Sequence, residues 1–549
     1  MANPEKEIET RMSLFQKFGL LVASVFFLVS VFYVHFMGPT KVEYEPGMTI
    51  LNLAHWQMNT GFREGFEEMD REFEAIQAKK GRKVKIIQTT IPGRGYQQWL
   101  ITQLVGGEPA DVIENPYEGA IRDQYFTALS PYLGKPNPFN KGTPLEGIPW
   151  KDTFIDNMEG AFDVFYADYY GLGVAFFAQR LHVNVDLVEK ATGSRKLPTD
   201  LVEWVETCQK IQEYGERIRK PIIPIGVEGL DRSTLNFLFV QYYSQTSGNL
   251  MDRDSRFCEC FVWGADILQG IKNGTVNTDR LLAVVDILRE IGQYFQPGFT
   301  TMGLEQTTYL FHQGQVAFLP GHSANSYSLI ANSDFPVEII PIPPIGARHK
   351  YSPFFTGRVT ESGNKVEGLF GIPKATRHFD LALELLQFMT SWKINQETMA
   401  SCNWAPAVKF AHYSGFMKAF EPYLGGNPVV WDPWRHVWDS RSHRKRNEII
   451  EEIIQKNILH PQEYFLEEFR KYKHYMVEEL GETLTEYQRA NLMREMRRSQ
   501  LTVGLWQPDL DDAERGRVTL RGELVREDYA ERNMWNCMYA LQRKVSESF

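Results

Sequence analysis

Three short apolar runs decide the fold: TILNLAHW (residues 49–56), VKIIQTTI (84–91) and ADVIE (110–114). Each run has the length of a β-strand. Between the first two, apolar side chains recur at steps of 3 and 4 from Phe62 to Ile76, which predicts a helix, and residues 96–105 form a second predicted helix. The order strand, helix, strand, helix, strand predicts a mainly parallel sheet covered by helices on both faces. The sequence therefore predicts an α/β fold.

The ends of the predicted strands indicate where a ligand binds. In an open sheet of this kind, ligands bind beyond the carboxyl ends of the strands. A further strand is predicted at 315–319, and it runs out at Pro320, Gly321 and His322. The polar and aromatic side chains at these ends are Trp56, Gln57, Glu114, Asn115, Tyr117 and His322.

Composition limits the class of protein. The chain has 549 residues, of which 43% are hydrophobic and 23% charged, values typical of a folded protein of several domains. Its net charge of −10 argues against nucleic acid as a partner, because phosphate binding needs a surplus of Lys and Arg. The five Cys have no regular spacing, so we expect no disulfide scaffold.

An apolar run near the start of the chain, residues 18–37, predicts a transmembrane helix. As a helix it spans about 30 Å, the thickness of the bilayer core. No small-residue cleavage site follows it, and Lys6, Arg11 and Lys17 precede it, which places the N-terminus in the cytoplasm. We therefore expect an uncleaved anchor. The alternatives are a buried core helix and an atypical cleaved signal.

The motifs that most resemble catalytic or metal sites are all incomplete. Residues 321–325 lack the final Gly of a nucleophile elbow, and residues 252–256 lack the turn Gly of a calcium loop. Cys258 and Cys260 have no second ligand pair at zinc spacing. We expect no catalytic residue, no metal and no cofactor, although sequence spacing alone cannot identify a glycosidase carboxylate pair.

Five segments, found in the same order, resemble family 1 of the extracellular solute-binding proteins, the maltose-binding-like receptors of ABC importers. The segment GGEPADV is similar to a signature of this family. The last of the five segments precedes the helix predicted at residues 379–392. The segments are 106–112, 170–174, 183–187, 313–318 and 367–374. The resemblance covers residues 49 to about 440.

The resemblance implies a two-lobed periplasmic-binding-protein fold of type II that closes like a hinge, with crossings near Val174, Pro320 and Gly371. A charged segment after Ser440 is longer than the closing helices of the family. Either it docks a partner or it packs on the second lobe as scaffold. The expected parts are a cytoplasmic tail (1–17), the anchor (18–37), a first lobe (48–174 plus 320–371), a second lobe (175–319 plus 372–440) and a helical extension (441–549).

In the resembled family the strand ends line a cleft, where aromatic rings stack on sugars and amides or carboxylates bind hydroxyl groups. His322 stands where the family often has Trp. The alternative for Trp56, Tyr117 and Trp404 is a place in the core, and for Glu114 a surface charge. The residues expected to bind ligand are Trp56, Gln57, Glu114, Asn115, Tyr117, His322, Ser323, Trp404 and Trp431.

The expected function is that of a carbohydrate receptor without enzyme activity. It is expected to be a single-pass protein of the bacterial cytoplasmic membrane, with its main domain periplasmic or extracellular, and to deliver a sugar to an ABC transporter permease. The alternative is a membrane-tethered glycan-processing enzyme or a sugar sensor on the same fold. A carboxylate pair facing the cleft would indicate the enzyme.

Overall fold

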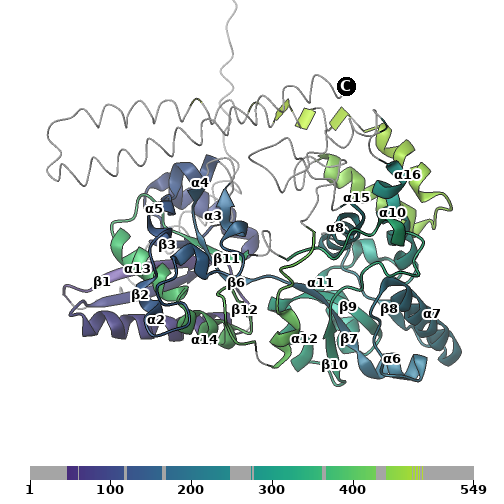
Figure 1. The fold of residues 1–549 in the computed structure, drawn as a ribbon, viewed down its shortest axis with the longest axis horizontal. Coiled ribbons are helices and arrows are strands. Elements are labelled where there is room, and N and C mark those ends of the chain that lie inside the picture. The colour runs from purple at the N-terminus through teal and green to yellow at the C-terminus, as the bar shows by residue number, and fades with distance from the viewer. Residues whose placement is uncertain are drawn as a thin grey trace, which may run out of the picture.

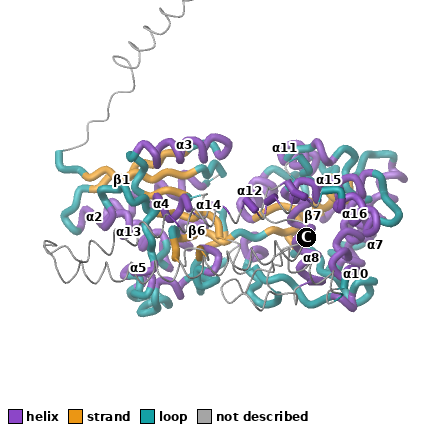
Figure 2. Tube along the Cα trace, turned by 90° about the horizontal axis from the view of Figure 1, so that it is seen from above, coloured by secondary structure: helices purple, strands orange, loops and turns teal. Residues whose placement is uncertain are grey.

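A computed structural model describes residues 46–472 and a few positions from 474 to 492, and it leaves several gaps within these limits. The gaps up to residue 472 are residues 60, 116–119, 164–167, 231, 248–273, 275–276, 362–365, 414 and 428–440. Two α/β lobes lie side by side along the longest axis of the molecule (Figure 1). The strands form two separate groups, one in each lobe (Figure 2).

The first lobe contains a six-stranded sheet in the order β12-β6-β11-β3-β1-β2. Its strands β1, β2 and β3 are parallel, as the sequence predicts, whereas β11 is antiparallel to both β3 and β6. The strands are β1 (Thr49–His55), β2 (Val84–Thr90), β3 (Val112–Glu114), β6 (Leu172–Phe176), β11 (Val366–Gly371) and β12 (Ala405–Pro406). A separate two-stranded sheet contains β4 (Phe162–Asp163) and β5 (Asp168–Tyr169).

Helices cover this sheet because their apolar stripes face it. In α2 the predicted stripe is buried except at the partly exposed Ile76, and Phe62, Phe66 and Phe73 are 0% exposed. The helix ends before Gly81, whose φ of 76° lies in the left-handed region that favours glycine. The helices are α2 (Phe62–Lys79), α3 (Gly93–Gly106), α4 (Ala120–Tyr125), α5 (Ser130–Leu133), α13 (Phe379–Met389) and α14 (Trp392–Cys402).

The second lobe contains a four-stranded sheet in the order β10-β7-β9-β8. In this sheet β8 and β9 are parallel, whereas β7 is antiparallel to both of its neighbours, β9 and β10. The strands are β7 (Gln179–Asn184), β8 (Ile223–Ile225), β9 (Val316–His322) and β10 (Val337–Ile340). The helices are α6 (Val185–Thr192), α7 (Leu201–Ile218), α8 (Ser233–Ser247), α10 (Thr278–Gly292), α11 (Leu304–His312) and α12 (Ser323–Ala331).

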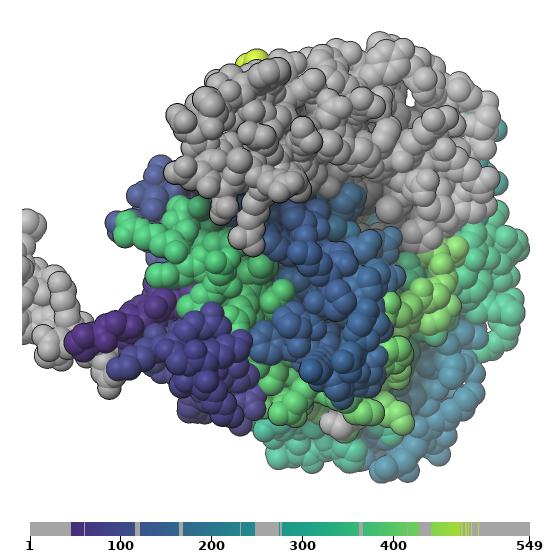
Figure 3. All heavy atoms as spheres, turned by 60° about the vertical axis from the view of Figure 1, so that its left-hand side comes forward, coloured from purple at the N-terminus to yellow at the C-terminus, as the bar shows by residue number. Residues whose placement is uncertain are grey.

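Strand pairing divides the chain between the lobes differently from the expected boundaries. Residues 320–322 end β9 in the second sheet, and β10 also pairs there, so 320–340 belongs to the second lobe. Conversely, α13 and α14 share the core of β1 in the first lobe, where Figure 3 shows green later residues against purple and blue earlier ones. The reason is that partner choice between strands depends on long-range packing, which local patterns do not encode.

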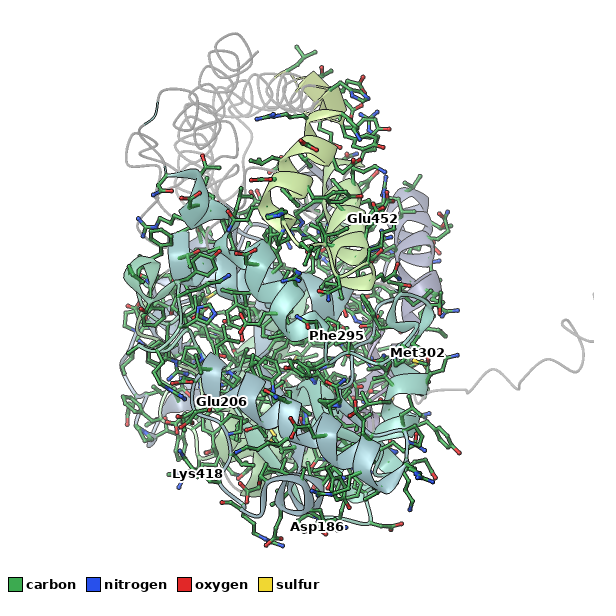
Figure 4. The ribbon with its side chains drawn as sticks, turned by 90° about the vertical axis from the view of Figure 1, so that its right-hand side faces the viewer. Asp186, Glu206, Phe295, Met302, Lys418 and Glu452 are labelled. Carbon is green, nitrogen blue, oxygen red and sulfur yellow. The ribbon has the colours of Figure 1, made fainter. Side chains whose placement is uncertain are left out.

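Two helices of the C-terminal extension are part of the second lobe. They are α15 (Arg441–Gln455) and α16 (Pro461–Arg470). Their apolar stripes, including Ile453 and Phe465 at 0% exposure, join the core formed by α7, α8 and α10. In Figure 4, Glu452 of α15 lies in the upper half of the view and Asp186 of α6 at its bottom. These two helices therefore pack on the second lobe, as the scaffold interpretation expects.

The predicted membrane anchor, residues 18–37, lies outside the described residues. Within the part of the chain that the structure describes, no helix combines the length and the apolar character needed to cross a bilayer.

Candidate functional site

Strands β1 and β3 of the first lobe end on the same side of its sheet, which we call the edge that carries the candidate site. β1 and β3 are parallel, and β11 is antiparallel to β3, so β11 begins where the other two end. This topology places Trp56 and Gln57 after β1, Glu114 at the end of β3, and Glu367 at the start of β11.

A shared amide joins the strand-end residues into one group. Gln57 Nε2 donates hydrogen bonds to Glu114 Oε1 at 2.6 Å and to Glu367 Oε1 at 3.3 Å. The backbone N–H of Trp56 donates to Glu114 Oε2 at 3.2 Å, and the Tyr96 hydroxyl donates to the backbone oxygen of Glu114 at 2.7 Å. We call Gln57, Glu114 and Glu367 the acid–amide cluster.

The acid–amide cluster holds its protons more tightly than free carboxyls do. Burial raises the pKa of Glu114 to about 8, against the opposing hydrogen bond from Gln57 and with a further contribution from the negative charge of Glu367. Burial also raises the pKa of Glu367. At neutral pH Glu114 is therefore mostly protonated and uncharged. The cluster thus avoids burying a second negative charge away from water.

A chain of polar groups holds the backbone of Gln57. The backbone N–H of Gln57 donates to His55 Nδ1 at 3.2 Å, which leaves the ring proton on Nε2, 3.3 Å from Gln88 Oε1. Gln88 Nε2 in turn donates to Asp70 Oδ2 at 2.7 Å. Burial lowers the pKa of His55, consistent with a neutral ring. The backbone turn after β1 is thereby fixed before any ligand arrives.

Trp56 places an aromatic ring at this end of the sheet. Its ring is partly exposed and meets the Tyr96 ring edge-on, with centroids 4.9 Å apart and planes at 67°. This contact orients Trp56 without enclosing it, because the ring stays partly exposed. Such a ring can stack on the apolar face of a sugar.

A second group of candidate residues lies at the end of β9. His322 Nε2 lies 3.0 Å from Asn325 Nδ2, and its ring packs on Phe177 with centroids 5.1 Å apart. Burial lowers the pKa of His322 to about 4, so the ring is neutral and Nε2 accepts from the amide. Its Nδ1 is buried without a hydrogen-bond partner in the described structure. Ser323 is buried, and its backbone N–H donates to Ala178 O at 3.0 Å.

Not every predicted residue belongs to these two groups. Trp404 is 2% exposed in the core of the first lobe, where its ring lies 5.0 Å from that of Phe62, so it is a core residue and not a wall of the cleft. Asn115 is buried beside Glu114, and its backbone N–H donates to Leu369 O. Tyr117 and Trp431 lie outside the described residues.

Glu367, Tyr96 and Asn325 belong to these two groups but were not predicted from the sequence as site residues. Glu367 lies at the start of an antiparallel strand, whereas the strand-end rule concerns the carboxyl ends of parallel strands. Asn325 follows His322 by three residues in α12, a spacing that places the two side chains together and could have been noticed. A hollow of about 510 Å³ lies elsewhere, over α11, and contains none of the candidate residues.

The chain is similar to known proteins in sequence and in fold. Residues 59–395 match the family described as bacterial extracellular solute-binding protein. RafE from Streptococcus pneumoniae, in its apo form, is 15% identical with a TM-score of 0.54, and the match covers 79% of this chain and 99% of that chain. RafE in complex with raffinose is 17% identical with a TM-score of 0.51, covering 78% and 99%.

A third solved structure extends the same likeness. The GacH receptor of Streptomyces glaucescens, described unliganded and with acarbose, is 13% identical with a TM-score of 0.53, and the match covers 78% of this chain and 99% of that chain. None of the curated protein sequences matches the chain. At these identities the solved structures establish the fold, which is the periplasmic-binding-protein type.

Proposed function

Because the chain belongs to the bacterial extracellular solute-binding protein family, we propose that it captures a carbohydrate between its lobes and delivers it to an ABC transporter permease. The family consists of binding proteins and not of enzymes. The observation that carries the choice of a carbohydrate is the pairing of a partly exposed Trp56 ring with the acid–amide cluster beside it. Sugar sites combine a ring that stacks on C–H groups with fixed acceptors for hydroxyl protons.

The descriptions of similar structures support the same ligand class. RafE is described in complex with raffinose and GacH in complex with acarbose. Within the proposed site, Glu367 is the carboxyl that remains partly exposed, whereas Glu114 is 0% exposed. We assign stacking on the sugar to Trp56, hydroxyl recognition to Glu367, and the positioning of Gln57 to Glu114.

The carboxylate pair itself does not favour the glycan-processing alternative. A glycosidase needs two carboxyls that both reach the scissile bond. Both oxygens of Glu114 accept hydrogen bonds from the protein, one from Gln57 and one from the Trp56 backbone. This arrangement suits a binding site better than an acid–base pair.

The ligand proposal is tested by calorimetry and thermal shift on the full chain in detergent. The probes are raffinose, maltose, acarbose and xylo-oligosaccharides, with galacturonate as an acidic control. A sugar at 100 times its Kd should add about 2.7 kcal/mol of stability. If no neutral sugar changes the melting temperature while a peptide or an amino acid does, the carbohydrate class is wrong.

We also propose that residues 18–37 anchor the protein in the cytoplasmic membrane with the two lobes outside. The apolar length of this segment and the missing cleavage site support the anchor. The full chain should stay with the membrane pellet after carbonate extraction. A released form that begins near residues 38–48 would contradict it.

A further inference from the structure

Three chain segments cross between the lobes, and one buried ion pair links the second and third of them to the strand that follows the first. The first crossing joins β6 to β7 through Phe177 and Ala178. The second leaves the second lobe at residues 356–361 before β11 begins. The third follows β12 and passes through the short helix η7 (Gly415–Phe420) and residues 421–427 before α15. Both lobes must move about these segments if the protein closes.

Arg180, two residues after the first crossing, uses every donor of its guanidinium group. It forms a bidentate ion pair with Glu361, with the second of these contacts at 3.1 Å. Its Nε donates to Ala419 O at 2.8 Å, and its Nη atoms donate to Gln179 O at 2.9 Å and Glu421 O at 3.3 Å. These bonds account for all five N–H groups.

Glu361 continues the connection from the second crossing to the third. Its Oε2 accepts from the Tyr423 backbone N–H at 2.8 Å, and its own N–H donates to Tyr423 O at 2.8 Å. One residue earlier, the Thr360 N–H donates to Asn427 O at 2.7 Å. The side chains of Arg180 and Glu361 are 6% and 11% exposed, so water screens the pair little.

The apolar side chains packed around the ion pair come from the same chain segments. Ala178 of the first crossing packs in a small core with Met417 and Phe420 of η7, and this core also contains Phe176 of β6 and Ala405 of β12. The guanidinium carbon of Arg180 lies 5.8 Å from the Phe420 ring centroid.

The beginning of the third crossing is hydrogen-bonded to the first lobe. The Lys409 N–H donates to Thr153 O at 2.8 Å, and the His412 N–H donates to Gln396 Oε1 at 3.4 Å. From Ala419 to Asn427 the hydrogen bonds instead run to Arg180 and to residues 358–361. The third crossing therefore passes from one lobe to the other between His412 and Ala419.

We propose that the Arg180–Glu361 pair is a hinge clamp that fixes the second-lobe ends of the three crossings as one block, and thereby sets how readily the lobes close on a ligand. The proposal rests on the proposed function in so far as it concerns ligand affinity. Bending is then concentrated at Phe177–Ala178 and in the chain after His412. Neither clamp residue needs to touch the ligand.

The test compares three variants with one control in the full chain by hydrogen exchange. Arg180→Met and Glu361→Gln break the pair, and the double variant Arg180→Met/Glu361→Leu removes both charges, which avoids an unpaired buried charge. The control is Arg232→Met, which breaks a bidentate pair between Arg232 and Glu451 within the second lobe.

Exchange in the free protein decides the clamp without any ligand. The clamp variants, including the double variant, should exchange at least tenfold faster in segments 177–184, 356–361 and 415–427 together, and Arg232→Met should not. A rise limited to 177–184, an equal rise in Arg232→Met, or wild-type exchange in the double variant would overturn the proposal.

Ligand affinity is the second measurement. A looser hinge lowers the fraction of molecules able to close, so Kd for a bound sugar should rise several-fold in the clamp variants. An unchanged Kd would overturn the link to closure. If wild-type protein binds no sugar, the proposed function fails, but the exchange result still decides whether the clamp exists.

Discussion

Replacement of Glu114 by Gln should change how stability depends on pH. The pKa of Glu114 is raised to about 8 in the folded protein, mainly by burial, from an ordinary value of 4.5. Between these values the folded protein holds one more proton than the unfolded chain, so stability is present at low pH and is lost as pH rises towards 8. In this range the free energy of unfolding falls by about 1.4 kcal/mol for each pH unit.

From pH 5.5 to 7.5 the wild type should therefore lose about 2 to 3 kcal/mol relative to Glu114→Gln. The amide introduced by this substitution has one acceptor oxygen for two donors, Gln57 Nε2 and the Trp56 N–H. The variant should thus start about 1 kcal/mol less stable, an offset that does not vary with pH. Asp70, whose pKa is raised to about 7, is present in both proteins, and its contribution cancels.

Urea denaturation at pH 5.5, 6.5 and 7.5, with unfolding of each lobe followed separately, measures the difference. Infrared spectra provide an independent check, because the protonated carboxyl of Glu114 should give a band that is absent from the variant. The control is Glu384→Gln, whose carboxyl has a lowered pKa and should give a constant difference over this range. A difference for Glu114→Gln that is flat or grows with pH would refute the reasoning.

Three other predictions concern single side chains. Trp56→Ala should weaken sugar binding by about 1 to 3 kcal/mol in calorimetry with little change in unfolding, and the reverse pattern would make Trp56 a core residue. Trp404→Ala is the matched control: it should lower unfolding stability by about 3 to 5 kcal/mol and leave the Kd of the folded fraction unchanged. Ile453→Ala should destabilise the second lobe by about 2 to 5 kcal/mol, since this side chain is 0% exposed in the shared core; a wild-type melting temperature would mean that α15 is an accessory.

The sequence by itself determined the local elements and the class of protein. The stripe from Phe62 to Ile76 predicts α2, and the three apolar runs predict β1, β2 and β3 in their parallel order. These features follow from periodicity within short windows. The strand-end rule also pointed to Trp56, Gln57 and Glu114, because the end of a strand is visible in the sequence.

Only the tertiary structure decided which distant segments meet. Gln57 and Glu367 are 310 residues apart, yet a hydrogen bond joins them, and no local pattern predicts such a pairing. The same is true of Trp404, which packs on Phe62 in the core, and of β9 and β10, whose partner β7 places them in the second lobe. The raised pKa of Glu114 likewise results from burial by surrounding elements, because desolvation is a property of the assembled fold and not of any residue alone.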